Sequence, residues 1–411
     1  MKHFILVFVL LINSLFFAIY SILGIEYEGA EKSNTFAIIC SVGAFIGIVT
    51  VFWGEYKNRN PHKRIFMYFV PLLVYLFAYL RIRAYYSIVP NLNHVTLVFL
   101  CFSVPAIFIG TYLANSNSIL KTRRWFDFFM FVLSFGILLS LPQMIKAENV
   151  TIAGSSYQAT SYTAAFCFAV NFYELTASDF QWKFRLKNIV VVFLRIFFLV
   201  LQILCTFIGG GRGAAILLIV SFILILWSRI RRLGRGVMIM LLVSFIFLFV
   251  LNHLDAFLAE RLEYGYERAF SYITERGIDV TQTSGRDYVY GEAISSIQKN
   301  PTCGYGLLGY LVPTNYTIGY SPHNIFLHIL LQGGIILLFL FVVFLLRLTY
   351  KYYQLVHRNK QILFLLPVFL YPIIVLLFSG DYLMTPLFWF MISYLVSVRL
   401  NPYILLGNKD N

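Results

Sequence analysis

Charged residues are scarce in this sequence. Only 12% of its 411 residues are Asp, Glu, Lys or Arg, whereas 60% are hydrophobic. A soluble domain of ordinary composition has about a quarter of its residues charged, so this composition excludes a soluble globular enzyme and a disordered chain. The 5 cysteines are too few for a small scaffold held together by disulfides.

Common catalytic motifs are also missing. The chain has no Gly-x-x-x-x-Gly-Lys phosphate-binding loop, no His-Glu-x-x-His zinc motif, no Cys-x-x-Cys pair and no Asp-x-Asp pair. His323 and His328 are five residues apart, and at this spacing two side chains do not share a helical face well enough to bind a metal together. We therefore expect no metal, nucleotide or other cofactor.

Long apolar runs, by contrast, are abundant. A helix needs about 20 apolar residues to cross a bilayer, and the runs predict about twelve such helices. The expected fold class is therefore an all-α polytopic membrane protein. The predicted spans are Phe4–Gly24, Phe36–Trp53, Ile65–Leu80, His94–Ala114, Trp125–Leu141, Tyr157–Glu174, Lys187–Ile208, Gly213–Trp227, Gly236–Leu251, Asn324–Leu346, Ile362–Phe378 and Met384–Val398.

Lys and Arg are concentrated in alternate connections between these spans, as in Lys57–Arg64, Lys121–Arg124 and Arg229–Arg235. Because basic residues mark the cytoplasmic ends of membrane helices, the net charge of +14 indicates an orientation and not a nucleic-acid-binding surface. The pattern predicts that both termini are cytoplasmic. The first apolar run is too long for a cleaved signal peptide, so we expect it to be retained as an anchor.

One connection is much longer than the others. It divides the chain into residues 1–251 with nine expected spans, an external loop over 252–322, and residues 323–411 with the last three spans and a cytoplasmic tail. Loops of this length are usually functional. Apolar spacing predicts a helix over His253–Ile273, and Ser284 is placed to cap a second helix over Gly285–Lys299. The segment Thr302–Gly319 is expected to be irregular.

Two arginines are expected at the outer level of the membrane, against the charge bias. Arg212 lies in Gly209-Gly210-Gly211-Arg212-Gly213 between two spans, and Arg286 begins the second loop helix. Arginine offers a planar fork of donors that fits a phosphate or diphosphate, and the glycines allow a ligand to approach the backbone. The alternative is that both arginines reach out to lipid headgroups.

Three further arginines are ambiguous. Arg195 lies about halfway along its span, where a charge normally faces the protein interior, so it either binds the ligand or forms an internal salt bridge. Arg81 and Arg83, at the outer end of the third span, are either further phosphate contacts or ordinary helix-end residues.

The other polar candidates flank the last three spans. His323 ends the external loop, and histidine can act as a general base near neutral pH; a capping or interfacial role is the alternative. Asn324 would orient His323 or a sugar. Asp381, the only acid in the last external turn, would orient His323, pair with an arginine, or simply end a helix.

The order and setting of these residues resemble the O-antigen ligase/polymerase superfamily of bacterial envelope glycosyltransferases, which includes Wzy-type polymerases and lipopolysaccharide ligases. The resemblance covers Gly209–Asp381, and the first six spans match only in hydropathy. It is carried by Arg212 after a small-residue turn, by Gly285-Arg286 in a large loop, by Asn300-Pro301-Thr302-Cys303-Gly304-Tyr305-Gly306, and by His323-Asn324 before a helix that contains Gly333-Gly334.

The resemblance implies a GT-C-like, metal-independent glycosyltransferase at the outer face of the bacterial inner membrane. Its donor is a glycan on undecaprenyl diphosphate. Arg212 and Arg286, with Arg195 as a third contact, would then stabilise the leaving diphosphate, and His323 would act as base with Asp381 orienting it. Asn324 and Tyr305 are the further candidates for substrate binding.

Three functions stay open at this point. A repeat-unit polymerase would use a second lipid-linked unit as acceptor and would be accompanied by a chain-length regulator. A ligase would use lipid A–core or a protein as acceptor. A flippase or transporter is a third reading, but such proteins usually need charged residues within their spans, and here Arg195 is nearly alone. Membrane lipids are expected partners, and nucleic acid is not.

Overall fold

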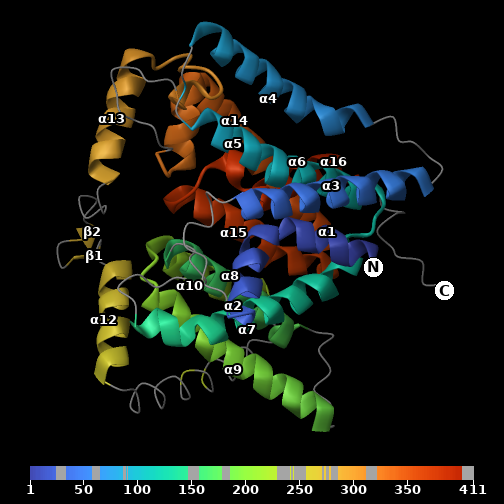
Figure 1. The fold of residues 1–411 in the computed structure, drawn as a ribbon, viewed down its shortest axis with the longest axis vertical. Helices are drawn as coiled ribbons and strands as arrows, with labels where there is room; N and C mark the ends of the chain where they lie inside the picture. Colours follow the sequence, from blue (N-terminus) through green and yellow to red (C-terminus); the bar gives the residue numbers. More distant parts are fainter. Residues whose placement is uncertain are drawn as a thin grey trace.

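The protein is built almost entirely from helices, as the computed structural model in Figure 1 shows. The bundle is described for residues 1–24, 34–57, 65–86, 89, 91–146, 157–177, 186–228, 241, 244, 256–270, 273–274, 277–278, 286–311 and 322–399.

The helices of the first half of the chain follow the predicted spans closely. They are α1 (Lys2–Leu10), α2 (Ile12–Ile22), α3 (Asn34–Lys57), α4 (Ile65–Tyr85), α5 (Leu92–Val98), a π-helical turn (Phe99–Ser103), α6 (Val104–Asn115), α7 (Arg123–Lys146), α8 (Tyr157–Thr176), α9 (Leu186–Ile208) and α10 (Arg212–Ser228).

In the second half, each remaining predicted span also coincides with a helix, except Gly236–Leu251, which lies almost wholly outside the described residues. The elements are α12 (Ala256–Phe270), strands β1 (Ile273–Thr274) and β2 (Gly277–Ile278), α13 (Arg286–Lys299), α14 (Ile325–Arg358), α15 (Leu365–Phe378) and α16 (Pro386–Ser397). Short 3-10 turns over Ile119–Thr122, Lys360–Phe364 and Tyr382–Met384 precede α7, α15 and α16.

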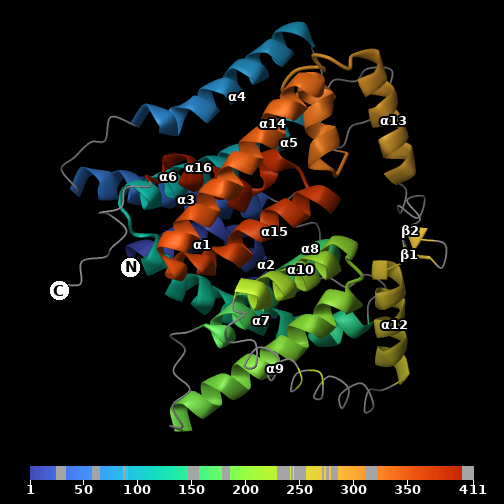
Figure 2. The same ribbon diagram turned by 180° about the vertical axis from the view of Figure 1, so that it is seen from behind.

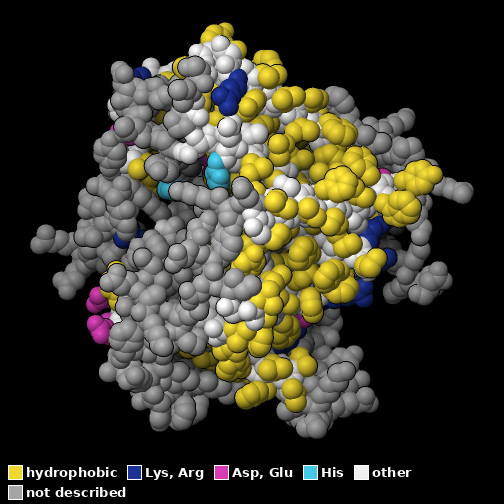
Figure 3. Space-filling model, viewed as in Figure 1, with side chains coloured by type: hydrophobic (Ala, Val, Ile, Leu, Met, Phe, Trp, Pro, Cys, Tyr) yellow, Lys and Arg dark blue, Asp and Glu magenta, His cyan; other side chains and the backbone are white. Residues whose placement is uncertain are grey.

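Within the described residues, 6 helices are long and apolar enough to cross a membrane, or 7 if the bent pair α1–α2 counts as one span. Large apolar side chains such as Phe45, Phe77, Phe193 and Phe339 are exposed on α3, α4, α9 and α14. They contribute to an extensive hydrophobic surface (Figure 3), of the kind that marks contact with a membrane or partner. The chain is therefore a polytopic α-helical membrane protein.

Two spans differ from their predictions. The predicted first span is broken at Leu11, where α1 and α2 meet at 91°. The helix predicted over Asn324–Leu346 is longer, and α14 has 34 residues with a kink at Gly334, whose φ of 62° is left-handed. Apolar patterning detects neither feature because both sides of each break are equally apolar.

The centre of the bundle is formed by α8, which packs against α7, α9, α10 and α15. Its Ala164, Ala165 and Ala169 are fully buried, and small residues of this kind let membrane helices approach closely. A second close pair is α6 with α16, where a Cβ on Gly110 would lie 2.7 Å from the carbonyl oxygen of Phe390.

The two helices of the large loop lie along one side of the bundle, with the β1–β2 hairpin between them, and Met1 lies on the opposite side (Figures 1 and 2). Both loop helices are confirmed; the predicted cap Ser284 lies outside the described residues. At Gly265, α12 comes so close to the end of α9 that a Cβ would collide with the backbone of Phe207. The hairpin, which pairs Ile273 with Ile278, was not predicted.

Candidate active site

The starts of α10 and α14 meet at the end of α15. The side-chain nitrogen of Asn324 donates to the carbonyl oxygen of Leu377 at 3.5 Å, and a Cβ on Gly213 would lie 2.8 Å from the Cβ of Phe378. The chain then continues from Phe378 into Ser379-Gly380-Asp381. The segments that carry Arg212, His323 and Asp381 are thus brought together, as expected for parts of one site.

The glycines around Arg212 serve helix packing. Gly210 has a left-handed φ of 60°, and a Cβ on Gly211 would lie 2.9 Å from the Cβ of Ser161 on α8. A Cβ on Gly213 would collide with the hydroxyl of Tyr162. Because α10 can begin only where these side chains are absent, the glycines fix the half-buried Arg212 at the first turn of α10.

His323 has an unusual backbone conformation. Its φ of 52° is left-handed, which few residues other than glycine adopt. Strain of this kind persists only where the surroundings hold it, and it is concentrated at functional sites. The side chain is half-buried and directly precedes the N-cap of α14.

Asn324 is that N-cap. Its side-chain oxygen accepts hydrogen bonds from the backbone N–H groups of Phe326 at 3.0 Å and Leu327 at 3.3 Å. Since its nitrogen donates to Leu377, both ends of the amide are engaged within the protein. The structure therefore shows a structural role for Asn324, in which it fixes the helix start next to His323, and contact with a sugar stays a prediction.

Asp381 is buried and faces His328. Its carboxylate oxygen accepts from the backbone N–H of Leu383 at 2.8 Å and lies 3.9 Å from Nδ1 of His328. The sequence analysis had considered only His323 or an arginine as its partner. The structure adds a second histidine that Asp381 faces, His328 in the first turns of α14.

A buried polar chain continues from this pair. The hydroxyl of Tyr382 donates to the side-chain oxygen of Gln332 at 2.6 Å, and the side-chain nitrogen of Gln332 lies 2.9 Å from Nε2 of His328. Burial, with a smaller contribution from the Asp381 carboxylate, raises the pKa of Tyr382 far above its ordinary value, so this hydroxyl stays protonated.

The hydrogen-bond roles along the chain follow from that donor. Because the oxygen of Gln332 accepts from Tyr382, its amide nitrogen donates to Nε2 of His328. Nδ1 of His328 then carries the ring proton and points toward Asp381. His328 and Gln332 were missed as site residues; the signal available was two polar residues one turn apart within an apolar helix, which normally indicates function.

The Asn300–Gly306 motif docks on the kink of α14. The backbone N–H groups of Tyr305 and Gly306 donate to the carbonyls of Leu331 and Gln332 at 2.8 and 2.7 Å, and that of Ile335 donates to Pro301 at 2.8 Å. The two glycine-containing stretches that carried the family resemblance are therefore partners in one backbone contact.

Glycine is required on both sides of this contact. Gly304 and Gly334 have left-handed φ values of 60° and 62°. A Cβ on Gly304 would lie 2.6 Å from the carbonyl oxygen of Leu331, and one on Gly334 would overlap the backbone of Thr302. The motif thus encodes close backbone packing.

Tyr305 connects this motif to α13. Its hydroxyl donates to the carbonyl oxygen of Ser296 at 2.9 Å, so Tyr305 makes an internal contact, and its binding of substrate stays a prediction. The same contact anchors α13, which begins at Arg286, on the helix that begins beside His323. The side chain of Arg286 itself lies outside the described residues.

A comparison with protein families agrees with this arrangement. Residues 197–342 match a family described as O-antigen ligase, and this segment contains Arg212, Arg286, the Asn300–Gly306 motif and His323. Residues 197–342 therefore belong to the O-antigen ligase/polymerase superfamily. Searches of curated proteins and of solved structures gave no match.

In this O-antigen ligase/polymerase superfamily member, Arg195 lies away from the site. Its guanidinium is buried, 2.6 Å from the Asp127 carboxylate and 3.2 Å from the side-chain oxygen of Asn171, and it stacks 4.8 Å from the Phe131 ring. The end of α9 near Arg212 is about 20 Å further along the helix. The internal salt bridge, left open as the alternative to ligand binding, is what the structure shows.

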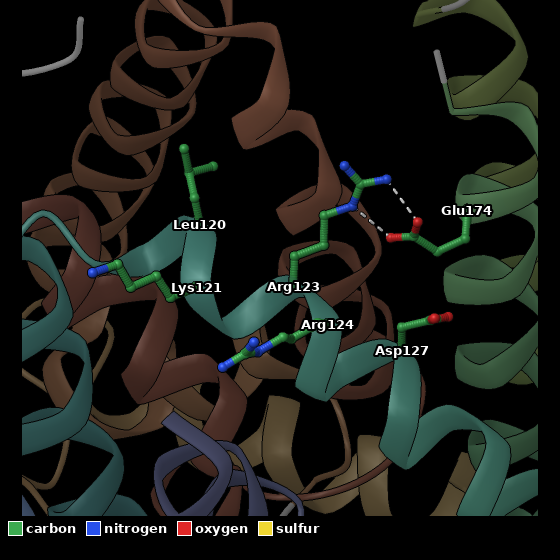
Figure 4. Close-up of a pocket in the computed structure, with 6 residues that line it drawn as sticks. All are labelled: Leu120, Lys121, Arg123, Arg124, Asp127 and Glu174. Carbon is green, nitrogen blue, oxygen red and sulfur yellow. Dashed lines mark hydrogen bonds and ion pairs between the residues drawn. The ribbon is translucent and has the colours of Figure 1, made fainter. Parts of the chain in front are cut away.

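Near this salt bridge lies an open hollow of about 670 Å³ at the start of α7 and the end of α8. Arg123 forms a two-point contact with Glu174 there, at 2.8 and 2.7 Å (Figure 4). Since the start of α8 touches the candidate site through Gln158 and Ser379, the hollow lies at the other end of the bundle. It is lined by Leu120, Lys121, Arg123, Arg124, Asp127 and Glu174.

Positive charge is placed at two helix starts in this site. The N-termini of α10 and α14 both abut the end of α15, and helix N-termini carry a partial positive charge. Arg212 adds a full charge at the first of them. Within the described part of the chain, no three His, Cys, Asp or Glu side chains lie together as metal ligands would.

Proposed function

We propose that this protein polymerises undecaprenyl-diphosphate-linked oligosaccharide repeat units into O-antigen or a capsular polysaccharide, at the outer face of the bacterial inner membrane. The observation that carries the proposal is that the helix starts next to Arg212 and His323 both contact the end of α15, through Gly213 and Asn324, inside the segment that matches the O-antigen ligase family. An arginine and a histidine at one site supply the two groups that this reaction needs.

In the proposed reaction, a hydroxyl of the acceptor sugar attacks the anomeric carbon of the donor. The new carbon–oxygen bond forms as the bond from that carbon to the diphosphate breaks, and the electron pair leaves with the diphosphate. Arg212, the N-terminus of α10 and Arg286 would stabilise the developing negative charge. His323 would accept the hydroxyl proton. Inversion at the anomeric carbon follows from a single attack.

Asp381, His328, Gln332 and Tyr382 have a different part in this proposal. They are buried and bonded to one another, so they would position α14 and hence His323, without touching the sugars. The further elements of the proposal are about twelve spans, a GT-C-like fold, cytoplasmic termini and an outer active site. The placement of Met1 opposite the loop helices supports this orientation (Figure 2).

A ligase is the second candidate. The description of the matched family as O-antigen ligase favours it, and a ligase would use the same donor and leaving group. The acceptor would be lipid A–core or a protein in place of a second lipid-linked unit. The site described here serves both reactions, because both break the same bond.

Glycan analysis of a deletion strain of the source bacterium tests the proposal. A polymerase predicts that single lipid-linked repeat units accumulate, whereas a ligase predicts full-length polymer retained on undecaprenyl diphosphate. Complementation with Arg212→Ala or His323→Ala should fail, while His357→Ala, an exposed histidine at the far end of α14, should restore the glycan. An unchanged glycan profile in the deletion strain would overturn the proposal.

A further inference from the structure

A second arginine lies against the family motif from outside the matched segment. Arg81 is in the last turn but one of α4, and its Nη1 atom is 2.7 Å from the position that a Cβ would take on Gly306. Gly306 has a left-handed φ of 85°. The absence of a side chain at Gly306 is therefore what leaves room for the guanidinium group.

The outer end of α4 is held firmly in this position. The Tyr75 ring stacks on that of Phe99 with centroids 4.2 Å apart, and its hydroxyl lies 2.8 Å from that of Thr96. Ile82, next to Arg81, is buried. The contact between α4 and the Gly306 segment is thus supported by packing on both sides.

Arg81 and Arg83 differ in what they bind. The guanidinium of Arg83 donates to the side-chain oxygen of Asn93 at 2.9 Å and lies 5.7 Å from the Tyr79 ring. Among the described residues, none hydrogen-bonds or ion-pairs with the exposed side chain of Arg81. From the sequence, the two arginines had the same predicted roles, whereas in the structure their contacts differ.

The peptide groups of Gly306 do not form hydrogen bonds with Arg81 either. The N–H of Gly306 donates to the carbonyl of Gln332, and its own carbonyl accepts from the N–H of Gly309 at 2.9 Å. The guanidinium therefore lies against the loop, and these peptide groups leave its donors available for a ligand. A guanidinium fork suits the paired oxygens of a phosphoryl group.

Arg81 also lies apart from Arg212. In Figures 1 and 2, α4 and α10 are on different sides of the bundle, with α14 and α15 between them. Along α14, the stretch from Asn324 to Gln332, which bonds to Gly306, is about 12 Å long. A phosphate bound to Arg81 would therefore not be the one whose bond to the sugar breaks near Arg212 and His323.

We propose that Arg81 binds a phosphoryl group of the second lipid substrate, the acceptor, while Arg212 binds the donor diphosphate. This assignment rests on the proposed function, in which a polymerase must hold two lipid-linked diphosphates at once, with the acceptor's diphosphate at least one repeat unit away from its reacting hydroxyl. The headgroup of an ordinary phospholipid offers the same chemistry, so the test has to distinguish the two sources.

The experiment counts bound lipids by native mass spectrometry of the purified full-length protein, with undecaprenyl diphosphate as the probe. The wild type should bind two molecules, and Arg81→Ala and Arg212→Ala should each bind one. Arg83→Ala, the matched control, should still bind two. Affinity at the second site should fall about tenfold to a hundredfold in Arg81→Ala, as for loss of a charged hydrogen bond.

Further variants test the geometry. Gly306→Ala places a Cβ 2.7 Å from Nη1 of Arg81 and so displaces the guanidinium. It should therefore lower binding at the second site as Arg81→Ala does, and the double variant should lose no more than either alone. Arg81→Lys keeps the charge without the fork and should recover little. Since Arg81 is exposed, Arg81→Ala should melt at the wild-type temperature.

The outcomes separate the two proposals. One molecule bound to both wild type and Arg81→Ala would overturn the role of Arg81 and leave the proposed function standing. No binding to the wild type would overturn both. Displacement of the second molecule by an equal concentration of phosphatidylglycerol would assign Arg81 to a phospholipid headgroup and overturn the acceptor role, whereas retention in a large excess of phosphatidylglycerol supports it.

Discussion

The hydroxyl of Tyr382 donates a hydrogen bond to the side-chain oxygen of Gln332 at 2.6 Å, while the backbone oxygen of the same glutamine accepts from the N–H of Gly306 at 2.7 Å. Gln332 thus joins the 3-10 turn over Tyr382–Met384 to the segment that contains Gly306, the first through its side chain and the second through its backbone. Both contacts lie at the kink of α14, two turns beyond the start of the helix at His323.

Tyr382→Phe should destabilise the protein. It removes the hydrogen bond that the side-chain oxygen of Gln332 accepts, and leaving a buried acceptor unpaired costs about 1–3 kcal/mol. We expect a lower unfolding temperature and reduced polymer formation, because α14 is less firmly held. Tyr350→Phe, on the exposed face of α14, is the control and should melt like the wild type. Equal melting temperatures of both variants would show that the hydrogen bond from Tyr382 to Gln332 adds nothing to stability.

The helices of this protein could largely be predicted from sequence, because a span is defined by its length and apolarity alone. The break between α1 and α2 could not, since Leu10, Leu11 and Ile12 are all apolar and no polar residue marks the bend. The kink at Gly334 depends on Thr302, a residue that is distant in the sequence. Such contacts are tertiary and leave no local pattern.

The candidate site was predictable to the level of residue types. Arg212 and His323 were found because charged or titratable residues next to glycine turns are unusual at the outer level of a membrane protein. Asp381 and Asn324 were named as candidates too, but the contacts they make were not predicted: Asp381 faces His328, and Asn324 caps α14. Partner choice depends on which helix packs on which, and the sequence alone does not specify this.

His323→Ala and His328→Ala should fail in different ways. Removing His323 removes the proposed base, so transfer should fall about 10²–10⁴-fold while the unfolding temperature stays close to that of the wild type. Removing His328 leaves Asp381 and Gln332 without their buried partner, so stability should fall as well. Activity assays and thermal unfolding of both purified variants give the comparison. Unchanged activity in His323→Ala would refute its assignment as base.

Gly334→Ala should prevent the large loop from docking. An added Cβ overlaps the backbone of Thr302, and alanine is strained at a φ of 62°. We expect Cys303, which is already exposed, and its neighbours on the motif to become more mobile, with faster hydrogen exchange over 300–306. Polymer formation should be lost.

The control for that variant is another glycine in the same region. A Cβ on Gly291 of α13 meets nothing within 4 Å, so Gly291→Ala should be tolerated and should stabilise the helix by up to about 1 kcal/mol. If both variants exchange hydrogen at the wild-type rate over 300–306, the backbone contact at the kink does not hold the loop.

Arg195 provides a test of the distinction between structural and substrate-binding arginines. Its guanidinium is buried against Asp127, and removing one member of a buried ion pair costs about 3 kcal/mol because the other charge is left unpaired. Arg195→Met should therefore lower the unfolding temperature, and adding Asp127→Leu should restore part of the loss, because the double variant leaves no unpaired charge.

A substrate-binding arginine would behave differently: affinity for undecaprenyl diphosphate would fall in the single variant and would not recover in the double. Measuring melting and undecaprenyl diphosphate binding on the wild type and these two variants distinguishes the two roles. We expect binding to stay within about twofold of the wild type in both variants, since Arg195 lies about 20 Å along α9 from the end that is near Arg212.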